Sequence, residues 1–328
     1  MFMKLRLLYI LTLAVMLCAC RASGTSGGSD TVRSEDDYTS GAAFDADSAY
    51  AFIERQVSFG PRVPNSEAHR KTGDWLVERL RQSGAKVVEQ PMSLRAFDGT
   101  LLSARNIFAQ YNPEASDRLL LLAHWDCRPW ADQDPDESRR HQPVDGANDG
   151  ASGVGVLLEI ARQLGKDPVK QGVDILFVDA EDWGDEGDDT SWAMGTRYFM
   201  EHPPVADYSP SQAILLDMVG SADATFGHEY FSSQSAPALI NDLWAIAADL
   251  GYGNLFVNSF GGAVTDDHTQ LIAHGVPAID IIDYRHGSMY QGFDPVWHTT
   301  SDGMDNISRA TLEAVGRTVA TYIRRREQ

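Results

Sequence analysis

Phe177-Val178-Asp179-Ala180-Glu181-Asp182-Trp183-Gly184 is the stretch on which the interpretation of the whole chain depends. The mostly apolar, β-branched run 173–178 has the length and composition of a buried strand. Two adjacent carboxylates, Glu181 and Asp182, follow at the point where this strand is predicted to end. Because neighbouring residues of an extended chain point in opposite directions, one carboxylate can bind a metal while the other faces a substrate as a proton carrier. The stretch therefore predicts a catalytic site at the end of a buried strand.

Strand-like and helix-like segments alternate around this stretch. The predicted strands are 86–94, 101–111, 118–123, 173–179, 213–216 and 276–282. The predicted helices are one ending before residue 60, one ending near residue 83, and 151–164, 195–200, 237–250, 267–273 and 309–325. Such alternation is typical of an α/β sandwich with a mostly parallel sheet, and the consecutive early strands predict an antiparallel edge. We find no internal repeat and expect one three-layer domain over residues 43–328.

The first twenty residues have the features of an export signal. A positively charged start precedes the apolar run 7–16, which is too short to span a membrane. The run ends in Leu17-Cys18-Ala19-Cys20, which resembles the lipobox of bacterial lipoproteins and implies cleavage before Cys20 and lipid attachment to its sulfur. An ordinary secretory signal is the alternative. Residues 21–42 predict a flexible tether, and a lipid-anchored periplasmic protein, in the outer membrane, is expected.

Charge and cysteine content narrow the class of protein further. Asp and Glu total 47 against 27 Lys and Arg, so the net charge is −20, and loss of the signal makes it more negative by two. Such a surface repels nucleic acid and anionic lipid, which leaves a lipid anchor as the expected membrane contact. Cys127 would be the single thiol of the mature chain, so no disulfide framework is expected.

Polar residues gather just past predicted strand ends, ahead of predicted helices, and in the segment Val296-Trp297-His298-Thr299. They are His124, Asp126, Asp149, Glu181, Asp182, Asp217, Asp266, Asp267, His268 and His298. In open α/β sheets, ligands bind beyond the carboxyl ends of the strands, so these side chains are expected on one rim. Asp149, Asp182 and His298 form a set that suits zinc and leaves a fourth position for substrate. The absence of cysteine among the candidates excludes iron–sulfur chemistry.

The same residues carry a family resemblance over about residues 50–325. The motifs are His124-x-Asp126, Gly146-Ala147-Asn148-Asp149-Gly150-Ala151, Glu181-Asp182, Leu215-Leu216-Asp217 and Trp297-His298-Thr299, together with Phe59-Gly60-Pro61-Arg62, residues 261–268 and Gly275-Val276-Pro277. This set resembles the zinc aminopeptidase superfamily and, within it, the glutaminyl cyclases. The resemblance implies a substrate peptide with N-terminal Gln, which is cyclised to pyroglutamate with release of ammonia.

The resemblance also implies a role for each matching residue. Asp149, Asp182 and His298 would bind one zinc ion, Glu181 would be the general acid/base, and Asp217 and Asp266 would be its carboxylate partners. Trp192 and Trp297 would line the substrate pocket, with Trp183 competing with Trp192 for that place. Two positions depart from the animal enzymes, where Asp182 is Glu and Asp280 is His.

Other interpretations stay open from the sequence. In a two-zinc aminopeptidase, His124, Asp149 and Asp217 would hold a second ion. A non-catalytic lipoprotein that binds metal or peptides is the second rival, although such a protein has no need of Glu181 as a proton carrier. The acidic loop 185–189 is a candidate calcium site. A monomer is expected.

Overall fold

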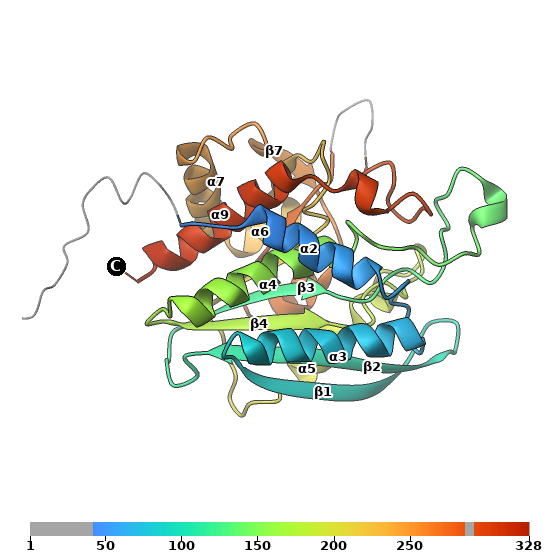
Figure 1. The fold of residues 1–328 in the computed structure, drawn as a ribbon, viewed down its shortest axis with the longest axis horizontal. Helices are drawn as coiled ribbons and strands as arrows, with labels where there is room; N and C mark the ends of the chain where they lie inside the picture. The colour runs from blue at the N-terminus through green and yellow to red at the C-terminus, as the bar shows by residue number, and fades with distance from the viewer. Residues whose placement is uncertain (1–41, 286–291, 328) are drawn as a thin grey trace, which may run out of the picture. The chain divides into compact units, whose positions relative to one another are not determined.

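The computed structural model describes residues 42–285 and 292–327 (Figure 1). The predicted signal peptide, Cys20 and residues 21–41 of the tether lie outside this part of the chain. Within residues 42–285 and 292–327, none of the helices combines the length and apolar character needed to cross a membrane.

A mixed sheet forms the centre of the fold. Its six strands, counted over the described residues, are β1 (Lys86–Arg95), β2 (Leu101–Tyr111), β3 (Arg118–His124), β4 (Gly172–Val178), β5 (Gln212–Asp217) and β8 (Ala278–Ile282), in the spatial order β1-β2-β4-β3-β5-β8. β2 pairs antiparallel with β1 and with β4, and the pairs β4–β3, β3–β5 and β5–β8 are parallel. The predicted mostly parallel sheet with an antiparallel edge is confirmed.

Helices cover both faces of this sheet. They are α2 (Ala46–Val57), α3 (Glu67–Gln82), α4 (Ala151–Lys166), α5 (Met194–Glu201), α6 (Tyr230–Ser235), α7 (Pro237–Asp249), α8 (Asp267–Ala273) and α9 (Arg309–Arg325). One face carries α3 and α4, with α2 and α9 packed on α4 (Figure 1), and the other face carries α5, α6 and α8. Side-chain caps start several helices where the sequence places a Ser, such as Ser66 before α3 and Ser308 before α9.

Strand β3 shows why the sheet needs helices on both faces. All seven of its residues are buried. Leu119 and Leu121 pack into the core beneath α4, whereas Leu120 and Leu122 pack with Phe199 of α5 on the opposite face. Because alternate residues of a strand face opposite sides, a continuous apolar run requires two covering layers. The structure therefore has the three layers expected of an α/β/α sandwich.

A small second sheet was not predicted. It pairs β6 (Phe226–Glu229) with β7 (Phe256–Gly262) in parallel, and α6 follows β6 directly. Both strands are short or irregular, and Gly227, Gly261 and Gly262 interrupt their apolar pattern, so neither gives the periodicity by which strands are predicted. This sheet carries the loop 263–266 to the edge of the site described below.

Helix α4 lies so close to the sheet that one position in its first turn accepts only glycine. A Cβ atom on Gly153 would stand 2.0 Å from the carbonyl oxygen of Leu216 and 2.9 Å from Cβ of Ala123. We therefore expect Gly153→Ala to destabilise the protein by about 1–3 kcal/mol through overpacking. The midpoint of denaturant unfolding measures this loss. Lys166→Ala, at the exposed end of the same helix, is the control and is expected to stay within about 0.5 kcal/mol of wild type. Equal midpoints for Gly153→Ala and wild type would contradict the close approach.

Candidate active site

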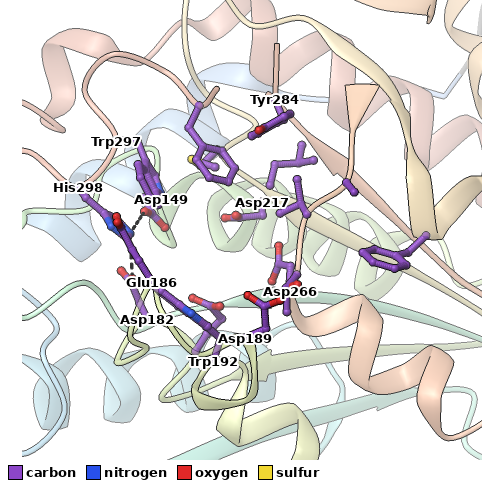
Figure 2. A pocket seen from close by; sticks show the side chains of 18 residues that line it. Asp149, Asp182, Glu186, Asp189, Trp192, Asp217, Asp266, Tyr284, Trp297 and His298 are labelled. Carbon is purple, nitrogen blue, oxygen red and sulfur yellow. Dashed lines mark ion pairs between the residues drawn. The ribbon is translucent and has the colours of Figure 1, made fainter. Parts of the chain in front are cut away.

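A cavity of about 410 Å³ opens beyond the carboxyl ends of β4, β5 and β8 (Figure 2). Its acidic and imidazole side chains are Asp149, Glu181, Asp182, Glu186, Asp189, Asp217, Asp266 and His298. Its larger apolar side chains are Trp192, Met218, Phe231, Val264, Ile282, Tyr284, Phe293 and Trp297. The structure thus brings together all eight residues expected to bind one metal, act in catalysis or line the substrate pocket. No Lys or Arg lines the cavity in the described part of the chain.

Asp149, Asp182 and His298 form a buried cluster of ligand atoms, all within 4.8 Å of one another. Nε2 of His298 lies 3.1 Å from Oδ1 of Asp182 and 3.5 Å from Oδ2 of Asp149. Neither oxygen of Asp182 has a hydrogen bond of good geometry within the described residues. Burial and the negative charge of Asp149 raise the pKa of Asp182. A cation is the partner that such a crowded carboxylate lacks.

Hydrogen bonds to the backbone hold Asp149 in place ahead of α4. The carboxylate of Asp302 accepts the N–H groups of Asn148 and Asp149, at 2.8 and 3.0 Å. The buried guanidinium of Arg62 donates to the carbonyl of Gly146 at 2.6 Å. These contacts explain why the Phe59–Arg62 motif, far away in the sequence, accompanies the loop that carries a site residue. Asp302 was not predicted.

Glu181 and Asp182 lie in a bend beyond β4, and this differs from the expectation for an extended pair. The strand ends at Val178, and Ala180 adopts a left-handed conformation with φ of 54°. The carboxylate of Asp126 accepts the N–H groups of both Glu181 and Asp182, each at 3.2 Å. Both side chains therefore line one cavity because the chain turns there, and strand alternation does not separate them.

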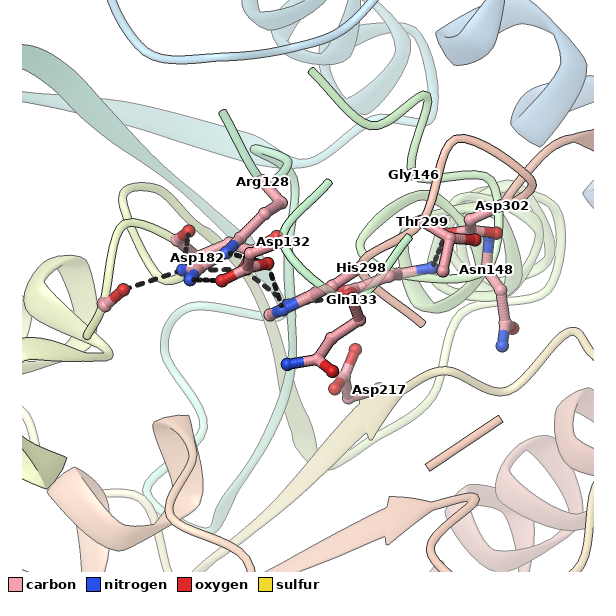
Figure 3. Close-up of polar contacts among 12 residues, drawn as sticks. Arg128, Asp132, Gln133, Gly146, Asn148, Asp182, Asp217, His298, Thr299 and Asp302 are labelled. Carbon is pink, nitrogen blue, oxygen red and sulfur yellow. Dashed lines mark hydrogen bonds and ion pairs between the residues drawn. The ribbon is translucent and has the colours of Figure 1, made fainter. Parts of the chain in front are cut away.

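A second layer of polar contacts supports the His298 side of the cluster (Figure 3). Arg128 donates to the backbone carbonyls of Asp182 and Gly184, at 3.1 and 2.8 Å, and pairs with Asp132 at 2.6 Å. Oδ1 of Asp132 lies 3.5 Å from Nδ1 of His298. Metal-binding histidines commonly have their second ring nitrogen oriented by a carboxylate in this way. The sequence analysis missed Arg128 and Asp132, and their only signal was the length and polarity of loop 127–147.

Glu181, Asp217 and Asp266 are the three other buried carboxyl groups of the cavity. Burial raises the pKa of Glu181 well above its usual range, and the charges of Asp266 and Asp182 act in the same direction. Burial likewise raises the pKa of Asp217 to about 7. Asp266 caps α8 and also lines the cavity, whereas Asp267 does not line it. Of these two neighbours, the one that lines the cavity is thus Asp266, the residue that the resemblance implied.

The residues of the alternative second metal site also lie together. His124, Asp149 and Asp217 have ligand atoms within 4.8 Å of one another. Nε2 of His124 lies 2.9 Å from Oδ1 of Asp149 and 3.2 Å from Oδ1 of Asp217. Among the groups of close His, Asp and Glu ligand atoms in the described chain, none includes a residue of loop 185–189.

Aromatic rings form the apolar wall of the cavity. Trp192 lies parallel to the His298 ring, with centroids 6.1 Å apart, and Trp297 lines the same cavity. Trp183 does not line it and packs edge-on against Trp130 at 5.7 Å. Trp192 therefore occupies the wall position for which the sequence had left two candidates.

Three further aromatic residues of the wall were missed by the sequence analysis. Phe293 packs between Tyr284 and Trp297, with ring centroids 4.8 and 4.4 Å apart. Phe231, in α6, also lines the cavity. Phe231 belongs to the region of the unpredicted second sheet, so no pattern in the sequence placed it near the site.

Comparisons with known proteins agree with this geometry. The model of peptidase family M28 matches residues 106–323. The solved structure of glutaminyl cyclase from Porphyromonas gingivalis is 52% identical in sequence, with a TM-score of 0.85, over 86% of this chain and 99% of that chain. A Zn-dependent exopeptidase from Parabacteroides distasonis is 49% identical, with a TM-score of 0.84, over 86% and 98%.

A curated relative from an animal is more distant. Bovine glutaminyl-peptide cyclotransferase is 23% identical over 292 residues, which make up 80% of this chain and 77% of that protein. The family match extends from β2 into α9 and includes every residue of the cluster Asp149, Asp182 and His298. The chain belongs to peptidase family M28.

Proposed function

We propose that this protein is a zinc-dependent glutaminyl cyclase, which converts the N-terminal Gln of peptides to pyroglutamate and releases ammonia. The observation that carries the proposal is the three-residue ligand cluster beside Glu181, in a cavity with an aromatic wall. The similarity to the P. gingivalis glutaminyl cyclase over nearly its whole length supports this activity over other M28 activities.

The ligand cluster fits a zinc ion. Carboxylate oxygen and imidazole nitrogen are both zinc ligands, and catalytic zinc sites combine three protein ligands with one position open for substrate. The unpartnered oxygens of buried Asp182 and the absence of Lys and Arg from the described cavity lining leave a need for positive charge. When bound there, zinc would polarise the side-chain amide carbonyl of the substrate and stabilise the negative charge that develops on its oxygen.

The reaction needs a proton carrier and no protein nucleophile. The α-amine of the substrate attacks the side-chain amide carbon, a C–N bond forms within the new ring, and the bond to the amide nitrogen breaks to release ammonia. Glu181 takes the proton from the attacking amine and gives one to the leaving nitrogen. Asp217 and Asp266, the proposed carboxylate partners of Glu181, line the same cavity, and the charge of Asp266 helps to raise the pKa of Glu181.

The wall of the cavity suits a small uncharged side chain. Trp192 and Trp297 offer apolar surface to the methylene groups of Gln, while the acidic rim at Glu186 and Asp189 faces solvent. The remainder of the peptide leaves the cavity across this rim.

We also propose one zinc ion per chain, a monomer, and a location on the periplasmic side of the bacterial envelope. The lipobox-like segment ending at Cys20 supports the lipid anchor, and the negative net charge argues against membrane contact by any other means.

Turnover of a peptide pair tests the activity directly. A Gln-led peptide is expected to release ammonia and to lose the mass of one ammonia, about 17 Da, because cyclisation expels the amide nitrogen. A Leu-led peptide of otherwise identical sequence is the control and should stay intact. Mass spectrometry and an ammonia assay on a sample of known metal content are the measurements. Release of free leucine by a protein that holds two zinc ions would replace this proposal with an aminopeptidase.

Glu181→Gln separates proton transfer from metal binding. The variant keeps the size of the side chain but has no group that exchanges protons, so we expect turnover of the Gln-led peptide to fall by at least about 100-fold. Zinc content, measured by elemental analysis, should equal that of wild type. A variant that loses its zinc would show that Glu181 is a ligand and not the proton carrier.

His298→Ala removes one ligand and is expected to lose bound zinc on dialysis. Asp132→Asn, which changes the carboxylate that lies beside Nδ1 of His298 and also pairs with Arg128, should weaken zinc affinity by about 10–100-fold. Asp185→Asn, an exposed site with the same change of charge that does not line the cavity, is the matched control and should retain its zinc. Full zinc occupancy in His298→Ala would contradict the proposed ligand set.

A further inference from the structure

A second buried cluster lies behind Asp266, on the side away from the proposed zinc ligands. It consists of Asp280 in β8, His268 in α8 and Glu229 at the end of β6, and each is 1% exposed or less. Nε2 of His268 lies 3.1 Å from Oε2 of Glu229, and its Nδ1 lies 3.8 Å from Oδ2 of Asp280. Ligand atoms of Asp266, His268 and Asp280 come within 4.8 Å of one another.

Asp280 lacks a positively charged partner of its own. The acidic groups around it are Asp266, Asp217 and Glu229, and His268 is the only basic group that faces it among the described residues. The Asp280 carboxyl lies within hydrogen-bonding reach of the Asp266 carboxyl. Neither oxygen of Asp280 has another hydrogen-bond partner in the described chain. Two carboxyl groups can form such a contact only when one of them carries a proton.

Glu229 is the closer carboxylate neighbour of His268. Its carboxylate accepts the N–H groups of Phe231 and Ser232, at 3.0 and 2.6 Å, and that of Val264 at 3.1 Å. Burial opposes its charge, but contact with His268 and these donors lower the pKa of Glu229 to about 2. Because Nε2 of His268 lies 3.1 Å from Glu229 while Nδ1 lies 3.8 Å from Asp280, the closer contact of this ring is with Glu229. The repulsion between the carboxylates of Asp266 and Asp280 must therefore be relieved within that pair.

We propose that Asp280 retains its proton and donates it in a hydrogen bond to Asp266, and so fixes the Asp266 carboxylate at the edge of the active-site cavity. Asp280 is then a positioning residue, while Asp266 faces the cavity. The part of this inference that concerns turnover rests on the proposed function; the shared proton does not.

Geometry favours a proton over a second cation at this place. Asp280 and His268 are 1% and 0% exposed, and neither lines the cavity, so an ion would have no solvent-facing position and no open route in this arrangement. A proton requires neither a solvent-facing position nor an open route. It also satisfies an oxygen of each carboxyl group in one contact, which removes the repulsion between two buried negative charges.

Two substitutions at one position test the hydrogen bond. Asp280→Asn keeps the shape and always presents an N–H donor to Asp266, whereas Asp280→Ala presents none. We expect kcat of Asp280→Asn for the Gln-led peptide to exceed that of Asp280→Ala by about 10–100-fold, the effect of losing a hydrogen bond to a charged group. Equal losses of kcat in two folded variants, as judged by circular dichroism, would overturn the positioning role.

The pH dependence of stability tests the proton itself, whatever reaction the enzyme catalyses. Burial and neighbouring Asp266 raise the pKa of Asp280 well above its usual range. The folded wild type then holds a proton that the unfolded chain releases above about pH 4, so wild-type stability falls as the pH rises from there toward the folded-state pKa. Asp280→Asn lacks this dependence. The Tm of Asp280→Asn minus that of wild type is therefore expected to increase between pH 5 and pH 8, at constant ionic strength.

The outcomes separate this inference from the proposed function. A Tm difference that stays constant across the pH range would overturn the shared proton. Loss of one metal equivalent in Asp280→Asn would overturn it in favour of a cation bound by Asp266, His268 and Asp280. Failure of wild type to cyclise the Gln-led peptide would overturn the proposed function, while the Tm comparison would still decide the shared proton.

Discussion

Crowded negative charge at the carboxyl end of the sheet is the constraint on which this structure depends. Asp149, Glu181, Asp182, Asp217 and Asp266 are all buried and line one cavity, with no Lys or Arg among its described lining residues. An unpaired buried charge is very costly, so every one of these groups needs a cation, a proton or a donor. The fold meets this need differently for different carboxyl groups. Some accept hydrogen bonds from backbone N–H groups, while others are left to bind a cation or to keep a proton.

Backbone N–H groups stabilise, through hydrogen bonds, the carboxylates that support the site without lining it. Asp302 accepts two N–H groups from the loop ahead of α4, and Asp126 accepts two from the bend after β4. Their own charges are thereby satisfied, and the loops they bind are fixed. Asp182, in contrast, is placed by its fixed backbone but given no donor of good geometry within the described chain. Asp182 is one of the carboxylates that we propose binds zinc, and its lack of backbone donors fits that role.

The sequence predicted the fold and the centre of the site well because both depend on local patterns. Buried strands are apolar runs, Asp182 and Asp217 lie at or just past the ends of β4 and β5, and Asp149 and Asp266 stand just ahead of α4 and α8. The supporting residues could not be predicted in the same way. Arg128 lies in a long irregular loop and finds its partners only when that loop folds against the bend at Asp182. Such contacts depend on tertiary packing, which leaves no periodic trace in the sequence.

The same constraint bears on whether one metal or two would be bound. His124 and His298 have the same relation to their carboxylates. Nε2 of His124 lies 2.9 Å from Oδ1 of Asp149 and 3.2 Å from Oδ1 of Asp217, and Nε2 of His298 lies 3.1 Å from Oδ1 of Asp182 and 3.5 Å from Oδ2 of Asp149. Asp149 belongs to both clusters and offers a different oxygen to each. Its charge therefore couples the two places, so a cation bound beside His298 reduces the negative charge that a second cation beside His124 would neutralise.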